Sequence, residues 1–219
     1  MLKMDEIQNL LAEKNIKMIV SNKRIYIDDR SAQSVPLENH YGISREISKD
    51  DTELKWSYCF YFRERRNTEE IRILKQFNTK EKALNYLFFK EISRYFMSEF
   101  IIPSRSYEIE HWTFEKVRRD MERLNIPAQY LSDETKVVPN SIIYQQKNNL
   151  WYTGFINDKK EKIYESPNGN GDSEWFFSLY GNDIYLFFLF DKYTEELLDR
   201  NIIEKAFSDQ VKLIVLDYK

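Results

Sequence analysis

Apolar residues recur along this chain with two spacings, and each spacing predicts a different kind of element. Where they return every three or four positions, as in DEIQNLLAEKNI, one face of a helix is apolar. The stretches with this spacing cover residues 5–16, 79–96, 113–127 and 194–207. Asp5 and Thr79 stand at the start of the first two helices, where we expect them to act as N-caps.

The other spacing, alternation or a short continuous apolar run, predicts strands. The predicted strands and hairpins cover residues 18–27, 56–77, 141–166, 184–190 and 210–218. Turns are expected near 147–149 and 157–160. Residues 29–54 are polar and predict a long loop or an insertion.

The strand WSYCFYF is unusually rich in aromatic residues. Since successive side chains of a strand point to opposite faces, four aromatic residues share one face, which we expect to be the core. They are Trp56, Tyr58, Phe60 and Phe62. Cys59 lies on the other face, within a strand dense in aromatics, and we expect it to be a small buried hydrophobe.

The order of elements predicts an α+β fold, with antiparallel sheets and flanking helices. Helix, hairpins and helix follow one another in residues 1–103 and in a similar order in residues 104–219. LNIP at 124–127 also echoes KNIK at 14–17. Two interpretations stay open: a diverged duplication of a helix–hairpin–hairpin–helix unit, or one continuous domain.

Composition narrows the class of protein. The chain has 219 residues, a single cysteine and only 5 glycines, and its net charge is −3. One cysteine fits a reducing cytoplasm, and the charged N-terminal stretch does not resemble a secretory signal. Few glycines and the lack of phosphate-loop motifs argue against a nucleotide-binding enzyme.

Residues 1–105 hold 19 basic and 16 acidic residues, whereas the rest holds 14 and 20. An acidic second half favours a basic protein partner over nucleic acid.

The turn after the aromatic strand contains three arginines that could bind single-stranded nucleic acid: Arg63, Arg65 and Arg66. Neighbouring glutamates favour the alternative, a solvated turn. His40 and His111 lie in no ligand spacing and have no serine or cysteine signature beside them. The stretch NGNGDSEW at 168–175 begins with calcium-loop spacing but lacks the glycine and the glutamate that an EF-hand loop requires. We therefore expect no metal, no cofactor and no catalytic site.

The aromatic strand, its turn and the next helix resemble the small α+β immunity proteins of bacterial polymorphic and contact-dependent toxin systems, including the predicted immunity family numbered fifty-nine. The matching positions are Trp56, Tyr58, Tyr61, Glu64, Arg65, Phe77, Ala83, Leu84 and Leu87. The second half matches only through Trp151, Tyr152, Phe155 and Asp158.

This resemblance implies a cytoplasmic inhibitor that is not an enzyme and that binds the C-terminal domain of a cognate toxin. Many such toxins are nucleases with basic clefts, so we expect the acidic and aromatic stretch 165–183 to form the contact. The expected partner-binding residues are Glu165, Asp172, Glu174, Trp175, Tyr180 and Asp183. Two other classes remain: a nucleic-acid-binding regulatory module, and an enzyme whose site is not recognised.

Overall fold

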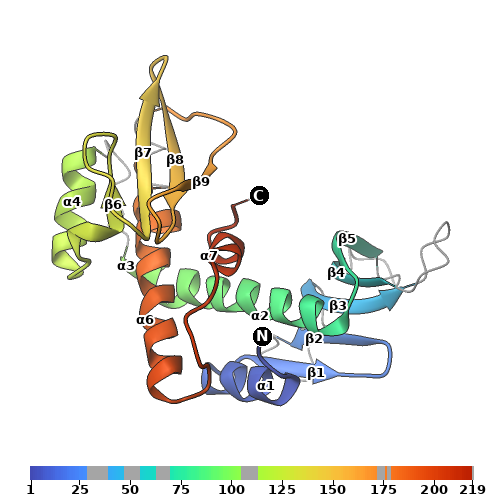
Figure 1. Cartoon of the computed structure of the whole chain (residues 1–219). Helices are drawn as coiled ribbons and strands as arrows, with labels where there is room; N and C mark the ends of the chain where they lie inside the picture. Colours follow the sequence, from blue (N-terminus) through green and yellow to red (C-terminus); the bar gives the residue numbers. More distant parts are fainter. Residues whose placement is uncertain are drawn as a thin grey trace. The chain divides into compact units, whose positions relative to one another are not determined.

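A computed structural model of the chain describes residues 1–28, 39–46, 55–62, 70–104, 113–171, 176 and 179–218, without the side chains of Glu46 and Tyr180. The chain forms two compact units, Met1–Ile92 and Ser93–Lys219 (Figure 1). The division falls earlier than the predicted one between residues 103 and 104. The structure confirms the α+β class, because each unit combines helices with a largely antiparallel sheet.

The first unit is a five-stranded antiparallel sheet with a helix before it and another after it. Its elements are α1 (Met4–Glu13), β1 (Lys17–Val20), β2 (Arg24–Asp28), β3 (His40–Glu46), β4 (Lys55–Phe62), β5 (Glu70–Phe77) and α2 (Lys80–Phe96), whose last residues belong to the second unit. Every strand lies beside its neighbours in sequence, in the order β1-β2-β3-β4-β5. Such a meander needs only short-range pairing between consecutive strands.

The core of the first unit uses the apolar faces that the helical spacing predicts. Ile7 and Leu11 of α1 are fully buried, as are Ala83 and Phe88 of α2. Burial of each such side chain contributes roughly 1.5–3 kcal/mol for the larger residues. The side chain of Asn85 bonds both backbone groups of residue 2, at 3.0 and 2.9 Å, and ties the N-terminus to α2.

Helix starts are set by local hydrogen bonds. The prediction for Thr79 is confirmed, because its hydroxyl accepts the backbone N–H of Lys82 at 3.2 Å. The prediction for Asp5 is wrong, because Lys3 is the N-cap of α1. The backbone N–H of Lys3 donates a hydrogen bond to the Glu6 carboxylate at 2.7 Å. Glu6 supplies the backward bond of a capping box, so the helix begins earlier.

Two predictions for the first sheet need correction. The predicted loop 29–54 contains strand β3, which pairs along its length with β4. The core face assigned to β4 is also wrong in part, since Trp56, Phe60 and Phe62 are only half-buried. Ser57, Cys59 and Tyr61 on the other face are buried, together with Tyr58. Alternation separates the two faces of a strand, but other segments decide which face they cover.

The second unit has a four-stranded sheet in the order β6-β7-β8-β9, with β6 parallel to β7 and the other pairs antiparallel. Its elements are the π-helix η1 (Met97–Ile101), α3 (Ile102–Ser104), α4 (Phe114–Arg123), the 3-10 turn η2 (Ala128–Tyr130), β6 (Leu131–Ser132), β7 (Ser141–Lys147), β8 (Leu150–Ile156), β9 (Lys162–Glu165), the π-helix η3 (Leu179–Tyr185), α6 (Leu186–Asp199) and α7 (Asp209–Val215). Helices stand before and after the sheet in each unit, but the sheets differ in strand number and only the second contains a parallel pair.

Both predicted turns of the second sheet are confirmed. Asn148 and Asn149 connect β7 to β8 with φ of 50° and 61°, as a two-residue turn with positive φ requires. Asn157 organises the second turn, where its side-chain oxygen accepts the N–H groups of Lys159 and Glu161 at 3.0 and 2.8 Å.

Two predicted strands are helices instead. The apolar run 184–190 belongs to η3 and α6, and residues 210–218 lie largely in α7. In α6 the buried residues recur at helical spacing, among them Phe187, Phe190 and Leu197. A short run that is apolar on every side fits a buried helix as well as a buried strand, so its periodicity alone could not separate them.

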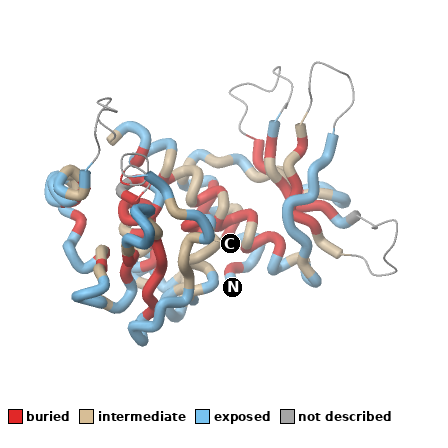
Figure 2. Tube along the Cα trace, turned by 90° about the horizontal axis from the view of Figure 1, so that it is seen from above, coloured by how far each residue is buried: buried red, intermediate tan, exposed pale blue. Residues whose placement is uncertain are grey.

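Buried positions, red in Figure 2, lie in the interior of each unit, and the turns and helix ends are exposed. Within the described parts of the chain, none of the helices combines the length and the apolar character that crossing a membrane demands.

Candidate functional site

The described surface of the second unit is hollowed beside α4 and β7, which lie near one another in Figure 1. A groove of about 310 Å³ is lined by Phe114, Arg118, Met121, Glu122, Ile126, Ala128, Leu131, Asp133 and Tyr144. A neighbouring hollow of about 340 Å³ is lined by Asp133, Glu134, Thr135, Tyr144, Gln145, Gln146 and Trp151. Asp133 and Tyr144 belong to both, so we treat these residues together as the α4–β7 face.

Helix α4 is held in place by a cap and an apolar side. Thr113 begins it, with its hydroxyl accepting the N–H of Lys116 at 3.3 Å. Val117 and Met121 are buried against the unit, while Arg118 and Glu122 are exposed. The helix therefore presents Arg118 and Glu122 along the groove, while Val117 anchors it to the unit and Met121 forms part of the groove wall.

An aromatic cluster forms the floor between helix and sheet. The Phe114 ring lies 4.7 Å from that of Tyr144, which lies 6.0 Å from that of Trp151. Trp151 in turn lies 5.5 Å from the buried Phe176. Phe114, Tyr144 and Trp151 are each half-buried. The guanidinium of Arg118 lies over the Phe114 ring, 4.5 Å from its centroid.

Asp133 is a carboxylate fixed by a turn. Its Oδ1 accepts the N–H groups of Thr135 and Lys136, both at 2.8 Å, and the Thr135 hydroxyl at 2.5 Å. The hydroxyl bond, the backbone bonds and the positive charge of Arg118 hold its pKa below the ordinary value. Asp133 therefore stays ionised at neutral pH and keeps its orientation.

Glu134 is the second acidic residue at the hollow. Its Oε1 accepts the side-chain N–H of Gln145 at 2.8 Å, and the Gln145 oxygen accepts Lys162 Nζ at 2.9 Å. The carboxylate is thus linked to the sheet through one amide. Glu134 remains exposed, so it can turn toward a bound group without loss of a buried contact.

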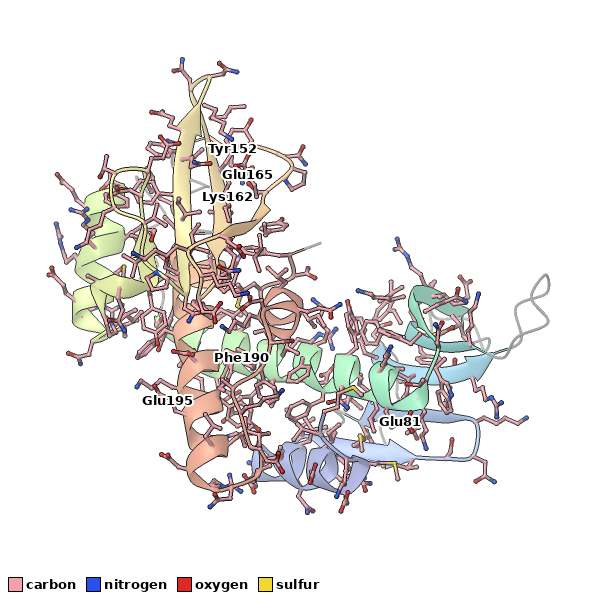
Figure 3. The ribbon with its side chains drawn as sticks, viewed as in Figure 1. Glu81, Tyr152, Lys162, Glu165, Phe190 and Glu195 are labelled. Atoms are coloured by element: carbon pink, nitrogen blue, oxygen red, sulfur yellow. The ribbon has the colours of Figure 1, made fainter. Side chains whose placement is uncertain are left out.

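The predicted contact stretch 165–183 is not one surface among the residues described. Glu165 lies on β9, where it is bonded by Lys147 at 2.6 Å and by Lys162, with Tyr152 nearby in Figure 3. The hydrogen bonds from Lys147 and then Lys162 are the main causes that lower the pKa of Glu165. Asp172, Glu174, Trp175 and the side chain of Tyr180 lie outside the described residues.

Asp183 corrects the prediction of an exposed contact residue, because it is buried, with 4% of its surface exposed. Its carboxyl oxygen accepts the Tyr218 hydroxyl at 2.6 Å. Burial is the main cause that raises its pKa to about 7, and the tyrosine bond lowers it by less. Asp183 lies in the π-helix η3, which runs directly into the largely buried helix α6, and this places its side chain in the interior.

Other candidate residues from the sequence are buried or lie outside the described parts. His40 is 3% exposed and stacks on Tyr61, with ring centroids 4.8 Å apart. Cys59 is buried, with Sγ 3.6 Å from the Ser44 hydroxyl. His111 and the arginines of the predicted turn, Arg63, Arg65 and Arg66, lie outside the described residues. Over the ranges that are described, histidine, cysteine and acidic side chains form no group of three that could hold a metal ion.

The α4–β7 face was not predicted as a site. Trp151 stood out only as part of the faint second copy of the aromatic strand. The available signals were the strongly amphipathic helix that starts at Phe114 and the turn Asp133–Thr135, which follows a short strand. What joins them is a parallel pairing of β6 with β7, which no local pattern indicates.

A half-buried aromatic floor with fixed charges around it can bind a protein surface, because apolar rings supply contact area and the charges select the partner. Comparison with known proteins adds no relative: no family model matches the chain, and neither a curated protein nor a solved structure matches it.

Proposed function

We propose that this chain is an immunity protein, a stoichiometric inhibitor that binds the toxic domain of a secreted bacterial toxin and blocks it. It acts in the cytoplasm of the cell that makes it, without turning over a substrate and without a cofactor. The observation that carries this proposal is the α4–β7 face, where three half-buried aromatic rings are surrounded by charged side chains.

The composition of this face supports a protein partner. Trp, Tyr and Arg are the residue types that most often dominate binding energy at protein interfaces, and Trp151, Tyr144 and Arg118 lie together here. The rings are held by their neighbours, so little conformational entropy is lost when a partner covers them.

The charge of the second unit supports a basic partner. Residues 93–219 contain 16 of the 33 basic residues but 21 of the 36 acidic ones. A nuclease cleft that binds phosphates is basic, so an acidic inhibitor is steered toward it and gains association rate. The resemblance of the aromatic strand and its following helix to immunity proteins points to the same class of partner.

We expect a gene beside this one to encode a secreted protein with a toxic C-terminal domain, and co-expression of that domain with this chain tests the proposal. Cells that make both proteins should grow, and the purified proteins should form a one-to-one complex. Trp151→Ala should weaken that complex roughly thirtyfold, about 2 kcal/mol, because it removes an aromatic contact at the centre of the face.

The matched control is Tyr152→Ala, since the next residue of β8 points to the opposite face of the sheet. This variant should bind as the unchanged chain does. Both substitutions remove a half-buried ring and should lower the thermal unfolding midpoint, so binding is compared at a temperature where both variants are folded. Cells that die despite co-expression, or a chain that lacks any affinity for the neighbouring toxin, contradict the function.

A further inference from the structure

The segment after β9 contains two asparagine–glycine pairs in a row, Asn168–Gly169 and Asn170–Gly171. Asparagine is a chemically labile residue, and a glycine after it favours loss of the side-chain amide. The reason is that glycine has no side chain to hinder attack by its backbone nitrogen on the asparagine amide. The two pairs have the same chemistry, so their structures decide whether they react alike.

The chain is tied to β8 on both sides of the first pair. Before it, the N–H of Ser166 donates to the Thr153 carbonyl at 2.8 Å, and the N–H of Thr153 donates to the Ser166 hydroxyl at 3.2 Å. After it, Asn170 and Trp151 exchange two backbone hydrogen bonds of 3.0 and 3.1 Å. Residues 167–169 thus stand opposite the one residue of β8 between Trp151 and Thr153, and they form a bulge between two anchors.

Asn168 lies in the middle of this bulge. It is exposed, and neither its backbone nor its side chain makes a hydrogen bond to the described residues. Rotation about its Cα–C bond brings the nitrogen of Gly169 toward its side-chain carbon. At this position the rotation breaks no hydrogen bond.

The packing on β8 requires a glycine after Asn168. A Cβ at residue 169 would lie 2.6 Å from the Cβ of Leu150 and 2.8 Å from the ring of Tyr152, both too close for a real contact. Only glycine therefore fits at this position without a shift of β8. The residue that the fold requires is also the residue that leaves its nitrogen unhindered.

Asn170 is held where Asn168 is not. Its carbonyl, which shares a peptide unit with the nitrogen of Gly171, accepts the N–H of Trp151 at 3.1 Å. Its own N–H donates to the Trp151 carbonyl at 3.0 Å. Both asparagines are exposed, so exposure does not distinguish them. Attack at Asn170 needs its peptide unit to rotate, and the bridge must open first.

We propose that Asn168 is a site of spontaneous deamidation and that its bridge to Trp151 protects Asn170. The backbone nitrogen of Gly169 forms a bond to the side-chain carbon of Asn168, and the bond from that carbon to the amide nitrogen breaks. The amide nitrogen leaves as ammonia with the proton of the Gly169 N–H, and a succinimide ring remains. Water then opens the ring at either of its carbonyl carbons and gives aspartate or isoaspartate.

The bulge can accept either product. Aspartate adds a carboxylate at an exposed position, and isoaspartate adds one backbone carbon to a segment that is already looped out between its anchors. The chain should therefore stay folded while its net charge changes from −3 to −4. This reaction uses no group of a partner, so it goes beyond the proposed function.

Peptide mass spectrometry of the aged protein tests the inference. The full, folded chain is incubated at mildly alkaline pH, which promotes loss of the backbone N–H proton, and samples are digested at acidic pH. Asn168 should lose its amide roughly tenfold faster than Asn170, because two hydrogen bonds oppose reaction at the second residue. A methyltransferase specific for isoaspartyl groups should label the product at residue 168.

The same incubation in guanidinium chloride is the control for the fold. Both asparagines precede glycine, so without the bridge they should react at similar rates. Asn168→Gln should remove the early product, because glutamine must close a larger ring. The matched variant Asn170→Gln keeps the backbone bonds of the bridge and should leave the rate at Asn168 unchanged.

Equal rates at the two asparagines of the folded chain, or a faster reaction at Asn170, would overturn the inference. So would a folded chain that keeps the amide of Asn168 while the chain in guanidinium chloride loses it. These outcomes are separate from those of the proposed function. A chain that fails to neutralise a toxin can still deamidate at Asn168, and a chain that neutralises one can lack the reaction.

Discussion

Asp183 shows how one buried group makes stability depend on pH. It is a carboxyl with 4% exposure whose bonded partner, Tyr218, stacks on Tyr164 at 4.1 Å between ring centroids. Burial raises its pKa from 3.8 to about 7. Because the folded state favours the protonated form, the stability linked to this proton is complete below the unfolded pKa and is lost as the pH rises through about 7.

Asp183→Asn should remove this dependence, because the amide stays neutral at every pH. The unchanged chain should lose roughly 3–4 kcal/mol relative to the variant between about pH 4 and pH 8, as a shift of about three pKa units implies. Urea unfolding across this range, with exposed Asp158→Asn as control, measures the difference. Two curves that stay parallel would show that Asp183 does not titrate in this range.

Four helices end in the same way, one in the first unit and three in the second. Helices α1, α4, α6 and α7 each end before a residue with positive φ: Asn15 (59°), Asn125 (54°), Asn201 (55°) and Asp217 (58°). After α4, the N–H of Asn125 bonds Glu122 and that of Ile126 bonds Met121, at 3.0 and 2.8 Å. This pair of bonds is the Schellman motif, and the other three helices make it too.

The repeated device explains the echo between KNIK and LNIP. The same Asn-Ile pair follows α6 at Asn201, although α6 is not the helix that the echo aligns with α1. Asparagine tolerates the left-handed conformation, and the isoleucine after it covers the last turn. The echo therefore reflects the way these helices stop, and it cannot distinguish a duplication from one continuous design.

Asn125→Ala should destabilise the second unit by about 1 kcal/mol, because alanine pays the full steric cost of positive φ. Asn125→Gly should leave the stability unchanged or raise it slightly, since glycine adopts this conformation freely. Urea unfolding midpoints of both variants, compared with exposed Gln129→Ala, test the motif. An alanine variant as stable as the glycine variant would mean that the φ of residue 125 is not constrained.

At the scale of the whole molecule, the two units differ in charge. Residues 1–92 hold 17 basic and 15 acidic residues, and residues 93–219 hold 16 and 21. The excess of acid lies in the unit that carries the α4–β7 face. Charges spread over a unit act mainly on the approach of a partner, whereas contacts within the face act on how long it stays.

Binding of a basic toxin domain should accordingly depend on salt through its association rate. Raising NaCl from about 20 to about 500 mM should slow association roughly tenfold or more, because the Debye length falls well below the size of the unit. The dissociation rate should change far less. Stopped-flow mixing of the two proteins separates the rates, and an association rate that ignores salt would argue against electrostatic steering.

Local patterns in the sequence were sufficient for much of the fold. The helices at 4–13, 80–96 and 114–123 and the hairpin turns at Asn148 and Asn157 follow from spacing, capping and turn chemistry, which act within a few residues. The same patterns failed for 184–190, because a short apolar run fits both a buried helix and a buried strand. They also failed for β3, which is stabilised by pairing with β4 and not by a pattern within its own residues.

The sequence by itself determined the positions of the helices at 4–13, 80–96 and 114–123, the α+β class and the acidic character of residues 93–219, because these depend on neighbours along the chain or on simple sums of charge. Only the tertiary structure decided that Asp183 is buried, which face of β4 is covered, and that Phe114, Asp133, Tyr144 and Trp151 meet at one face. Burial and convergence depend on which segments pack together in space, and that packing joins residues whose separation along the chain carries no local signal.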